Sequence, residues 1–343
     1  MKKRVIAVGV LMVLALGGCK NKISYYDKAK TAMEQGNYEE AADNYSKAIM
    51  EDEQLQMSYR GVGICSFLTG DYVKAEDYFL RGLGESKGIV GDVELDISYY
   101  LAETYVATAK TKEAIDIYTN ILEYDDKQSE ALVYRGTLYV RAGEVEKAKK
   151  DFEKAANNEK DDVSVYYHAY NALKDVDKTA DEYLEKGLKC KDDSKESTYM
   201  KGCLYKASGD YDTAIKILSD SKEAGFGKSA FTLGEIYELK GDFTTAVSNY
   251  NDYIKVSNPS VAEYVTIINC QINAGDYEAA MKNCQSTITN AGESEKKALR
   301  FEEIVVLEKI GDFNAAKEKM TKYLEDYPDD EKAKREFEFL QTR

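Results

Sequence analysis

Side chains that could carry out chemistry are few in this 343-residue chain, which has one histidine, His168, and six cysteines. No two cysteines stand in a CxxC spacing, and one histidine cannot complete a His/Cys zinc site. The sequence also lacks a Gly-rich phosphate loop, a GxSxG elbow and an HExxH pair. We therefore predict a protein that is not an enzyme, with no catalytic residue, no metal site and no cofactor.

Acidic residues are abundant, but their positions favour structural roles. Carboxylates at 92, 94 and 96 precede an expected helix, where they cap its start and complement its dipole. The run at 191–194 lacks the alternating ligands and final glutamate of an EF-hand loop, so we predict no calcium site there. His168 stands among three tyrosines and is expected to pack within a helix.

Five cysteines, at positions 65, 190, 203, 270 and 284, are expected to be small buried hydrophobic residues. Cys270 and Cys284 flank an expected helical turn at similar heights. A disulfide between them would suit an oxidising compartment. Free thiols are the alternative, because disulfide geometry is strict.

The first residues have the pattern of an export signal. Basic residues at 2–4 precede an apolar run at 5–16, which is shorter than the ~20 residues that a membrane-spanning helix needs. This predicts a signal peptide over residues 1–18. The Leu-Gly-Gly-Cys motif at 16–19 resembles the bacterial lipobox, in which the leader is cut before a cysteine that carries diacylglycerol. The resemblance implies that Cys19 is the lipidated N-terminus; an ordinary secretory leader is the alternative.

We expect the lipid on Cys19, followed by a short linker over residues 19–23, to be the only membrane anchor. The protein would then lie on the extracytoplasmic side of a bacterial membrane, either in the periplasm or at the cell surface. Its formal net charge changes from −15 to −18 when the three basic residues of the leader are removed. We therefore expect no nucleic-acid partner, because binding to phosphates needs a basic face.

A short pattern recurs along the rest of the chain. Its centre is a Gly-polar-aromatic turn at residues 36–38, 70–72, 209–211, 241–243, 275–277 and 311–313, with a weaker copy at 143–145. Three residues after the aromatic position comes an alanine: Ala41, Ala75, Ala148, Ala214, Ala246, Ala280 and Ala316. A small residue often stands seven before the glycine: Ala29, Gly63, Gly136, Gly202 and Gly234. Two helices that cross closely through small residues are predicted on either side of each turn.

This pattern resembles the tetratricopeptide repeat, a helix-turn-helix unit of 34 residues. The resemblance implies an all-α, right-handed superhelical solenoid over residues 24–330. It has nine repeats if two degenerate copies, with Ala109 and Asp177 in place of the turn glycine, are counted. Residues 331–343 are expected to form a C-terminal capping helix that covers the last repeat.

One segment interrupts the rhythm. Residues 82–91 contain four glycines, and the step between turns widens there to 39 residues. Because glycine weakens a helix, we interpret this segment as a hinge, with a longer rigid loop as the alternative.

By this resemblance, such solenoids hold peptides or folded partners along the surface of their first helices. The register places one groove-facing position on each first helix: Tyr26, Arg60, Tyr99, Val133, Tyr167, Tyr199, Phe231, Val265 and Phe301. Most are aromatic, and exposed rings suit recognition. We predict that these residues bind a protein or peptide partner, with the stretch from Tyr167 to Phe231 contributing most. Polar residues on the same wall are Lys206, Glu235, Glu238 and Asn269. The alternative is that the rings pack against the adjoining repeat.

The leading hypothesis is therefore a membrane-tethered extracytoplasmic adaptor or scaffold. A second hypothesis is a structural subunit of an envelope assembly machine, in outer-membrane or pilus biogenesis. An enzyme of the cell wall is disfavoured, because the sequence lacks the chemistry for it. Fold alone does not decide between these uses.

Overall fold

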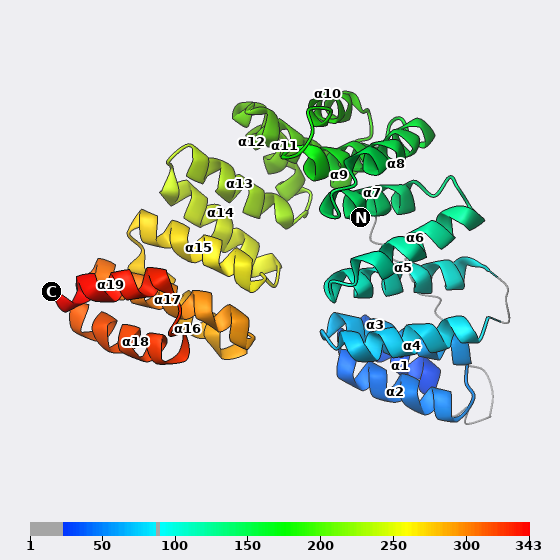
Figure 1. The fold of residues 1–343 in the computed structure, drawn as a ribbon, viewed down its shortest axis with the longest axis horizontal. Helices are drawn as coiled ribbons and strands as arrows, with labels where there is room; N and C mark the ends of the chain where they lie inside the picture. The colour runs from blue at the N-terminus through cyan, green and yellow to red at the C-terminus, as the bar shows by residue number, and fades with distance from the viewer. Residues whose placement is uncertain (1–22, 87–89) are drawn as a thin grey trace, which may run out of the picture. The chain divides into compact units, whose positions relative to one another are not determined.

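The structure, a computed structural model, describes residues 23–86 and 90–343. Within these ranges the chain forms nineteen α-helices and no strand (Figure 1). The helices up to α18 form nine consecutive antiparallel hairpins, and within each of the two units defined below every helix packs on the next. The prediction of an all-α solenoid of helical repeats is confirmed.

The nine hairpins are the repeats, and each has a first and a second helix. The first five repeats are α1 (Tyr25–Glu34) with α2 (Tyr38–Met50), α3 (Leu55–Leu68) with α4 (Tyr72–Gly84), α5 (Asp92–Ala107) with α6 (Thr111–Tyr124), α7 (Ser129–Arg141) with α8 (Val145–Asn158), and α9 (Val163–Leu173) with α10 (Ala180–Lys189). The last four are α11 (Lys195–Ser208) with α12 (Tyr211–Glu223), α13 (Lys228–Leu239) with α14 (Phe243–Val256), α15 (Val261–Ala274) with α16 (Tyr277–Asn290), and α17 (Glu293–Ile310) with α18 (Phe313–Asp326). Helix α19 (Glu331–Gln341) ends the chain.

Contacts divide the chain into two compact units, the first ending at Lys191 and the second covering Asp192–Arg343. The first unit holds α1 to α10 and the second α11 to α19. Residues 82–91 lie within the first unit, between α4 and α5, and residues 87–89 are outside the described residues. The hinge at 82–91 stays a prediction.

The turns inside the repeats depend on glycine. The seven turn glycines have φ between 76° and 88°, the left-handed region that glycine adopts without steric cost. In five repeats the aspartate after the glycine caps the second helix by accepting the backbone N–H three residues further on; these residues are Asp71, Asp210, Asp242, Asp276 and Asp312. The glycine therefore ends one helix, and the aspartate begins the next.

The two degenerate turns meet this requirement differently. Ala109 adopts φ of 58°, so it keeps the glycine conformation in spite of its Cβ, at a cost of about 1 kcal/mol. Asp177 instead accepts hydrogen bonds from the hydroxyl of Thr179 at 2.6 Å and from its N–H at 2.8 Å. These bonds lower the pKa of Asp177 to about 2. The fifth repeat thus turns through a side-chain hydrogen bond rather than through glycine.

The small residues of the first helices lie where the two helices of a repeat cross. A Cβ added to Gly63 would stand 2.5 Å from the ring of Phe79, and one added to Gly234 would stand 2.4 Å from the ring of Tyr250. The repeating alanines of the second helices are all fully buried: Ala41, Ala75, Ala148, Ala214, Ala246, Ala280 and Ala316. In the repeats that have glycine at this position, the helices approach closely because the first helix offers no side chain at the crossing.

Helix α19 covers the end of the ninth repeat. Its residues Ala333 and Leu340 are fully buried and belong to the same core as Met320 of α18. Asp330, just before α19, caps it and also accepts a hydrogen bond from the hydroxyl of Tyr323 at 2.9 Å. The capping helix expected after the repeats is present.

Candidate binding surfaces

The nine predicted groove positions all lie on first helices. Val133 and Phe301 are buried, with 4% and 8% of their surface exposed, and the other seven are half-buried. Four of the aromatic residues pack against a ring of the second helix in the same repeat, with centroids 5.2 to 6.0 Å apart: Tyr26 on Tyr45, Tyr99 on Tyr118, Phe231 on Tyr250 and Phe301 on Tyr323. These rings join the two helices of their own repeat.

The remaining aromatic positions have nearby ring partners. Tyr199 lies 4.8 Å from Phe226, in the turn before α13, and Tyr167 lies 5.2 Å from His168. Tyr167 belongs to the first unit, whereas Tyr199 and Phe231 belong to the second. The packing of these rings supports the alternative that they are structural, and their role in binding stays a prediction.

Polar residues on the first helices connect neighbouring repeats. Arg60 of α3 forms an ion pair with Asp96 of α5 at 2.5 Å. Lys206 of α11 pairs with Glu235 of α13 at 2.7 Å. Arg60, predicted to face the groove, is therefore engaged with the next repeat and stabilises the contact between α3 and α5.

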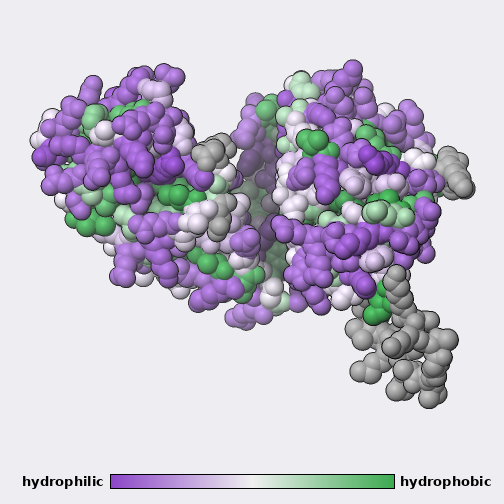
Figure 2. All heavy atoms as spheres, turned by 90° about the horizontal axis from the view of Figure 1, so that it is seen from below, coloured by the Kyte–Doolittle hydropathy of each residue, from purple (hydrophilic) through white to green (hydrophobic). Residues whose placement is uncertain are grey.

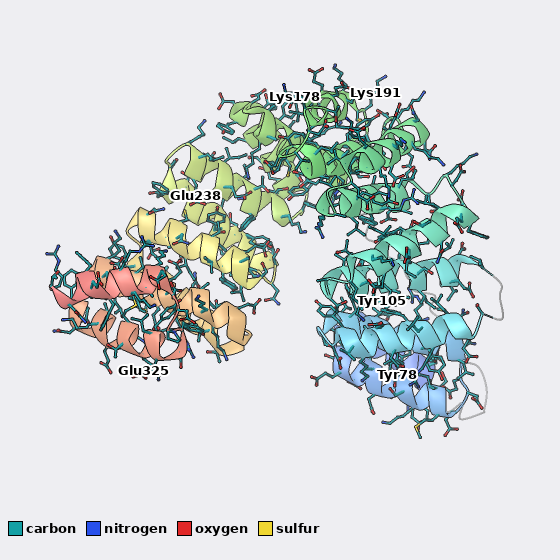
Figure 3. All side chains as sticks on the ribbon, in the orientation of Figure 1. Tyr78, Tyr105, Lys178, Lys191, Glu238 and Glu325 are labelled. Carbon is teal, nitrogen blue, oxygen red and sulfur yellow. The ribbon has the colours of Figure 1, made fainter. Side chains whose placement is uncertain are left out.

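Glu238 and Asn269 also have partners inside the second unit. The hydroxyl of Tyr250 donates to Glu238 at 2.5 Å, and Figure 3 labels Glu238 on α13. Burial, together with this carboxylate, raises the pKa of Tyr250. Asn269 hydrogen-bonds Glu302 of α17, whose pKa is nevertheless raised because burial outweighs that bond. These polar groups take part in packing between helices.

A pocket of about 350 Å³ opens between the starts of α7 and α9 in the first unit. Its walls are Glu130, Val133 and Tyr134 from α7, and Ser164, Val165 and His168 from α9. The hydroxyl of Tyr134 donates to Glu130 at 3.1 Å. We call this hollow the α7–α9 pocket; its size is at the lower end of the range for small-ligand sites, ~300–1,000 Å³.

His168 forms one wall of the α7–α9 pocket. Its ring lies 6.5 Å from Tyr134 and 5.2 Å from Tyr167, both edge to face. Burial lowers its pKa to about 4, so the imidazole is neutral at pH 7. Its Nε2 atom is buried and has no hydrogen-bond partner among the described residues. A neutral imidazole can offer an acceptor nitrogen to a bound group.

Tyr134 and His168 were not among the predicted groove residues. Each follows a predicted position by one residue, Val133 and Tyr167 respectively. On each helix the predicted residue and the next one are both apolar or ring-bearing, and this pairing is the sequence signal that could have identified Tyr134 and His168. Which of the two neighbours faces inward is decided only by packing against the next helix.

The five described cysteines are all free thiols, and four of them are buried. The sequence allows a disulfide between Cys270 and Cys284. In the structure the two thiols are free. Burial raises the pKa of both thiols to about 12, which leaves them unreactive. Across residues 23–86 and 90–343, no group of three or more His, Cys, Asp or Glu is placed to hold a metal ion.

Cys19 and the predicted leader lie outside the described residues. In the part of the chain that is described, every helix is too short or too polar to span a bilayer. Figure 2 shows hydrophilic residues over most of the visible surface of both units, with hydrophobic residues in small patches.

Comparison with protein families gives three matches. Models of the tetratricopeptide repeat match residues 26–88, 130–161 and 196–223. Together they touch both units, and the second stretch contains all of α8 and all of α7 except its first residue. A search of the curated proteins found no match.

Solved structures give further likenesses. The APC/C hetero-tetramer Cut9-Hcn1 matches with 10% identity, over 92% of this chain and 75% of that chain, at a TM-score of 0.52. Human IFIT1, solved as a dimer with PPP-AAAA, matches with 14% identity, over 93% and 86% of the two chains, at a TM-score of 0.51. A tetratricopeptide repeat protein from Parabacteroides merdae has 15% identity, coverage of 82% and 97%, and a TM-score of 0.46. At such identities the likeness shows the fold alone.

Proposed function

Because this chain is a tetratricopeptide-repeat protein, we propose that it is a membrane-tethered extracytoplasmic scaffold that binds a partner protein along its first helices. The observation that carries the binding part is the α7–α9 pocket, a hollow formed by two successive first helices. Pockets with an apolar wall and a few convergent polar groups are the usual places of recognition. Val133 and Val165 supply the apolar wall, and Glu130 and His168 supply polar groups.

The tether rests on the lipobox-like motif that ends at Cys19. In the variant Cys19→Ala, the chain loses the acyl chains that would hold it, which contribute about 0.8 kcal/mol per buried CH₂. We expect an uncleaved precursor or a soluble exported protein. Cell fractionation with detection of the leader measures this, and Cys190→Ala, which removes a thiol inside the first unit, is the control.

A Cys19→Ala protein that has lost its leader and still sediments with membranes would contradict the lipid anchor. The lipid anchor and the binding surface can be tested independently, since a soluble form of the protein keeps all of its repeats.

Partner binding can be tested in intact cells with a photo-crosslinking residue at Lys127, which lines the α7–α9 pocket and is exposed. The control position is Val73 of α4, whose side chain is 81% exposed and lies outside the pocket. We expect a crosslinked protein from position 127 and not from position 73, identified by mass spectrometry. Equal products from both positions, or none from position 127, would contradict binding at this surface.

A partner that copurifies in fixed stoichiometry under mild detergent would favour the role of a structural subunit in an envelope assembly. A partner present in variable amounts would favour an adaptor that binds and releases. The same preparation can be incubated with muropeptides to test for an enzyme of the cell wall.

A further inference from the structure

We propose that a hollow between the first two repeats receives an aromatic side chain, Tyr or Phe, from a partner protein. The hollow has a volume of about 310 Å³, and its lining includes Tyr38 and Ala42 of α2, Ser66 of α3 and Lys74 of α4. We call it the α2–α3 pocket. The inference goes beyond the proposed function, because none of these residues lines the α7–α9 pocket.

One position of the repeat holds a small residue at this place. It lies on the first helix, four residues before the turn glycine or, in the third repeat, before Ala109. From the third repeat on, it holds a large residue in every repeat with a regular turn: Tyr105, Tyr139, Tyr205, Tyr237, Gln271 and Leu307. In the second repeat it is Ser66, which is 3% exposed and so forms the bottom of the pocket rather than its rim.

The tyrosine at this position fills the space between successive repeats. Tyr105 packs against a core that contains Phe79 of the second repeat and against one that contains Tyr118 of the third. Tyr237 likewise packs against two cores, one with Leu218 of α12 and one with Tyr250 of α14. The place that these rings fill is therefore left open beside Ser66.

The opposite wall of the α2–α3 pocket is small as well. Ala42 lies six residues after the turn glycine, and the corresponding residues of the second, third, sixth, seventh and eighth repeats are larger: Glu76, Ile115, Ile215, Val247 and Met281. Ile215 packs against the same core as Tyr237, so the two positions meet between neighbouring repeats. With alanine and serine at both, the hollow that remains is too large for a single water molecule, which takes ~30 Å³ in the liquid.

The third repeat shows which groups surround a ring at this place. Tyr105 of α5 hydrogen-bonds Glu76, and Lys110 lies 5.4 Å from its ring (Figure 3). Lys110 also forms an ion pair with Glu76 at 2.6 Å. The ring therefore lies beside a carboxylate and an ammonium that balance each other.

The α2–α3 pocket offers comparable groups. Asp43 and Lys74 belong to its lining, and both are exposed. Asp43 pairs with Lys47 at 2.6 Å, and Lys74 lies 5.9 Å from the ring of Tyr78, so these charges favour a neutral guest rather than an ion. An aromatic ring can pack on the half-buried ring of Tyr38 and near Lys74, and a phenol hydroxyl can donate to Asp43.

Space for the backbone of the partner adjoins the pocket. A second hollow, of about 510 Å³, lies at the turn between α1 and α2, and Tyr38, Glu39 and Thr69 line both hollows. It also borders Gly36, where a Cβ would meet no atom within 4 Å. This extension favours a side chain that is presented by a peptide segment over a free small molecule.

The test uses the full chain, purified in detergent, and four mixtures of nonapeptides with blocked ends. The central residue of each mixture is Tyr, Phe, Leu or Ala, and the flanking positions vary among uncharged residues that are not aromatic. We expect the Tyr and Phe mixtures to be retained about tenfold more than the Ala mixture, and the Leu mixture about as little as the Ala mixture.

The decisive variant is Ser66→Tyr, which gives the second repeat the tyrosine of the third. We expect the ratio of Tyr to Ala retention to fall to about one, because the protein's own ring occupies the pocket. The melting temperature should be unchanged or higher, since the new ring fills an existing hollow. The matched control is Val73→Tyr on α4, a position that is 81% exposed and outside the pocket, and it should keep the full preference.

Ala42→Ile fills the same pocket from α2, with the residue that the third and sixth repeats have at this position. It should remove the preference as well, and it keeps the test decisive if Ser66→Tyr does not fold. Equal retention of the four mixtures, retention of none, full preference in a folded Ser66→Tyr or Ala42→Ile protein, or the same loss in Val73→Tyr would overturn the proposal.

These outcomes are distinguishable from failure of the proposed function. Crosslinking of a cellular protein at position 127, together with no preference for aromatic peptides, would leave partner binding at the α7–α9 pocket in place and remove only the contact at the first two repeats.

Discussion

In the fourth repeat, formed by α7 and α8, Gly136 of the first helix faces the ring of Phe152 on the second. A Cβ at Gly136 would stand 2.7 Å from that ring. In the ninth repeat, formed by α17 and α18, the same two positions hold Ile304 and Met320, both buried in one core. The fourth repeat pairs the smallest residue with a large ring, and the ninth pairs two residues of intermediate size.

The two repeats also place the positive and the negative member of an ion pair on opposite helices. Arg135 of α7 forms two hydrogen bonds with Asp151 of α8, both at 2.8 Å. At the corresponding positions of the ninth repeat, Glu303 of α17 accepts from Lys319 of α18 at 3.0 Å.

In each repeat a polar residue of the preceding repeat also hydrogen-bonds the ion pair. The hydroxyl of Thr119 accepts from Arg135 at 3.1 Å, and the amide of Gln285 donates to Glu303 at 3.4 Å. The two repeats therefore show that a helix crossing needs complementary size and charge, whereas the residue on either helix can be exchanged. Close packing imposes this condition because a pair must fill the same space whichever helix supplies the larger side chain.

The largest effect is expected from Gly136→Ile, which places the residue of the ninth repeat into the fourth. The branched side chain would meet the ring of Phe152 and destabilise the fold by about 3 kcal/mol. Denaturant unfolding measures the change. The second substitution Phe152→Met should recover most of the loss, because it recreates the pair of the ninth repeat. Equal stability of the single and double variants would mean that the two positions are not coupled.

The next effect concerns the ion pairs. Arg135→Ala leaves the carboxylate of Asp151, 10% exposed, without its cation, and should cost about 3 kcal/mol. Lys319→Ala likewise leaves the carboxylate of Glu303, 9% exposed, without its cation, and should also cost about 3 kcal/mol.

The exchange of charges can be tested directly with Arg135→Glu combined with Asp151→Lys. If complementarity matters rather than identity, the double variant is more stable than either single one, as a double-mutant cycle of unfolding free energies would show. A double variant as unstable as the sum of its parts would limit the comparison to size.

A smaller effect is expected at the helix starts. Asp312 caps α18 by accepting the N–H of Ala315 at 3.1 Å, whereas Glu144 at the start of α8 makes no such bond. Asp312→Ala should cost about 1 kcal/mol, and Glu144→Asp should stabilise the fold by about 0.5 kcal/mol, because the shorter side chain can accept from the N–H of Lys147, which donates only to the carbonyl of residue 144. Thermal unfolding measures whether Asp312→Ala lowers the melting temperature and Glu144→Asp raises it. Changes in the same direction would be evidence against the difference in capping.

The smallest effect depends on pH and concerns the ninth repeat. Burial and the nearby carboxylate of Glu336 raise the pKa of Glu308 to about 7, while the fourth repeat has Val140 at this position. Protonation of Glu308 therefore contributes stability that is present below about pH 4.5 and is lost as the pH rises through about 7. Glu308→Gln should raise the melting temperature at pH 8 and leave it unchanged at pH 4.5. A difference independent of pH would assign the effect to packing.

Much of the fold could be predicted from the sequence, because the turn residues are local in their action. Glycine at Gly70 or Gly241 permits a left-handed φ, and the aspartate that follows caps the next helix, so one short motif ends one helix and begins another. The buried alanines, such as Ala246 and Ala280, were predictable for a similar reason, since a fixed spacing on a helix places them on one face.

The candidate site was only partly predictable. Val133 lies in the wall of the α7–α9 pocket as the register indicates, but the next residue, Tyr134, shares that wall. On α9 the pocket is lined by His168 rather than by Tyr167. A small rotation of the helix about its axis decides which of the two neighbouring residues faces the pocket. This rotation depends on the size of the side chains on the next helix.

The sequence by itself determined the number of repeats, the turn positions and the small residues at the helix crossings, because each of these depends on backbone conformation or on the spacing along one helix. Tertiary structure alone decided that Arg60 pairs with Asp96 of the next repeat and that Tyr99 and Phe231 pack on rings of their own repeat. It also brought Glu130 and His168 into one pocket. These contacts join residues on different helices, and their partners are set by packing and charge in three dimensions rather than by distance along the chain.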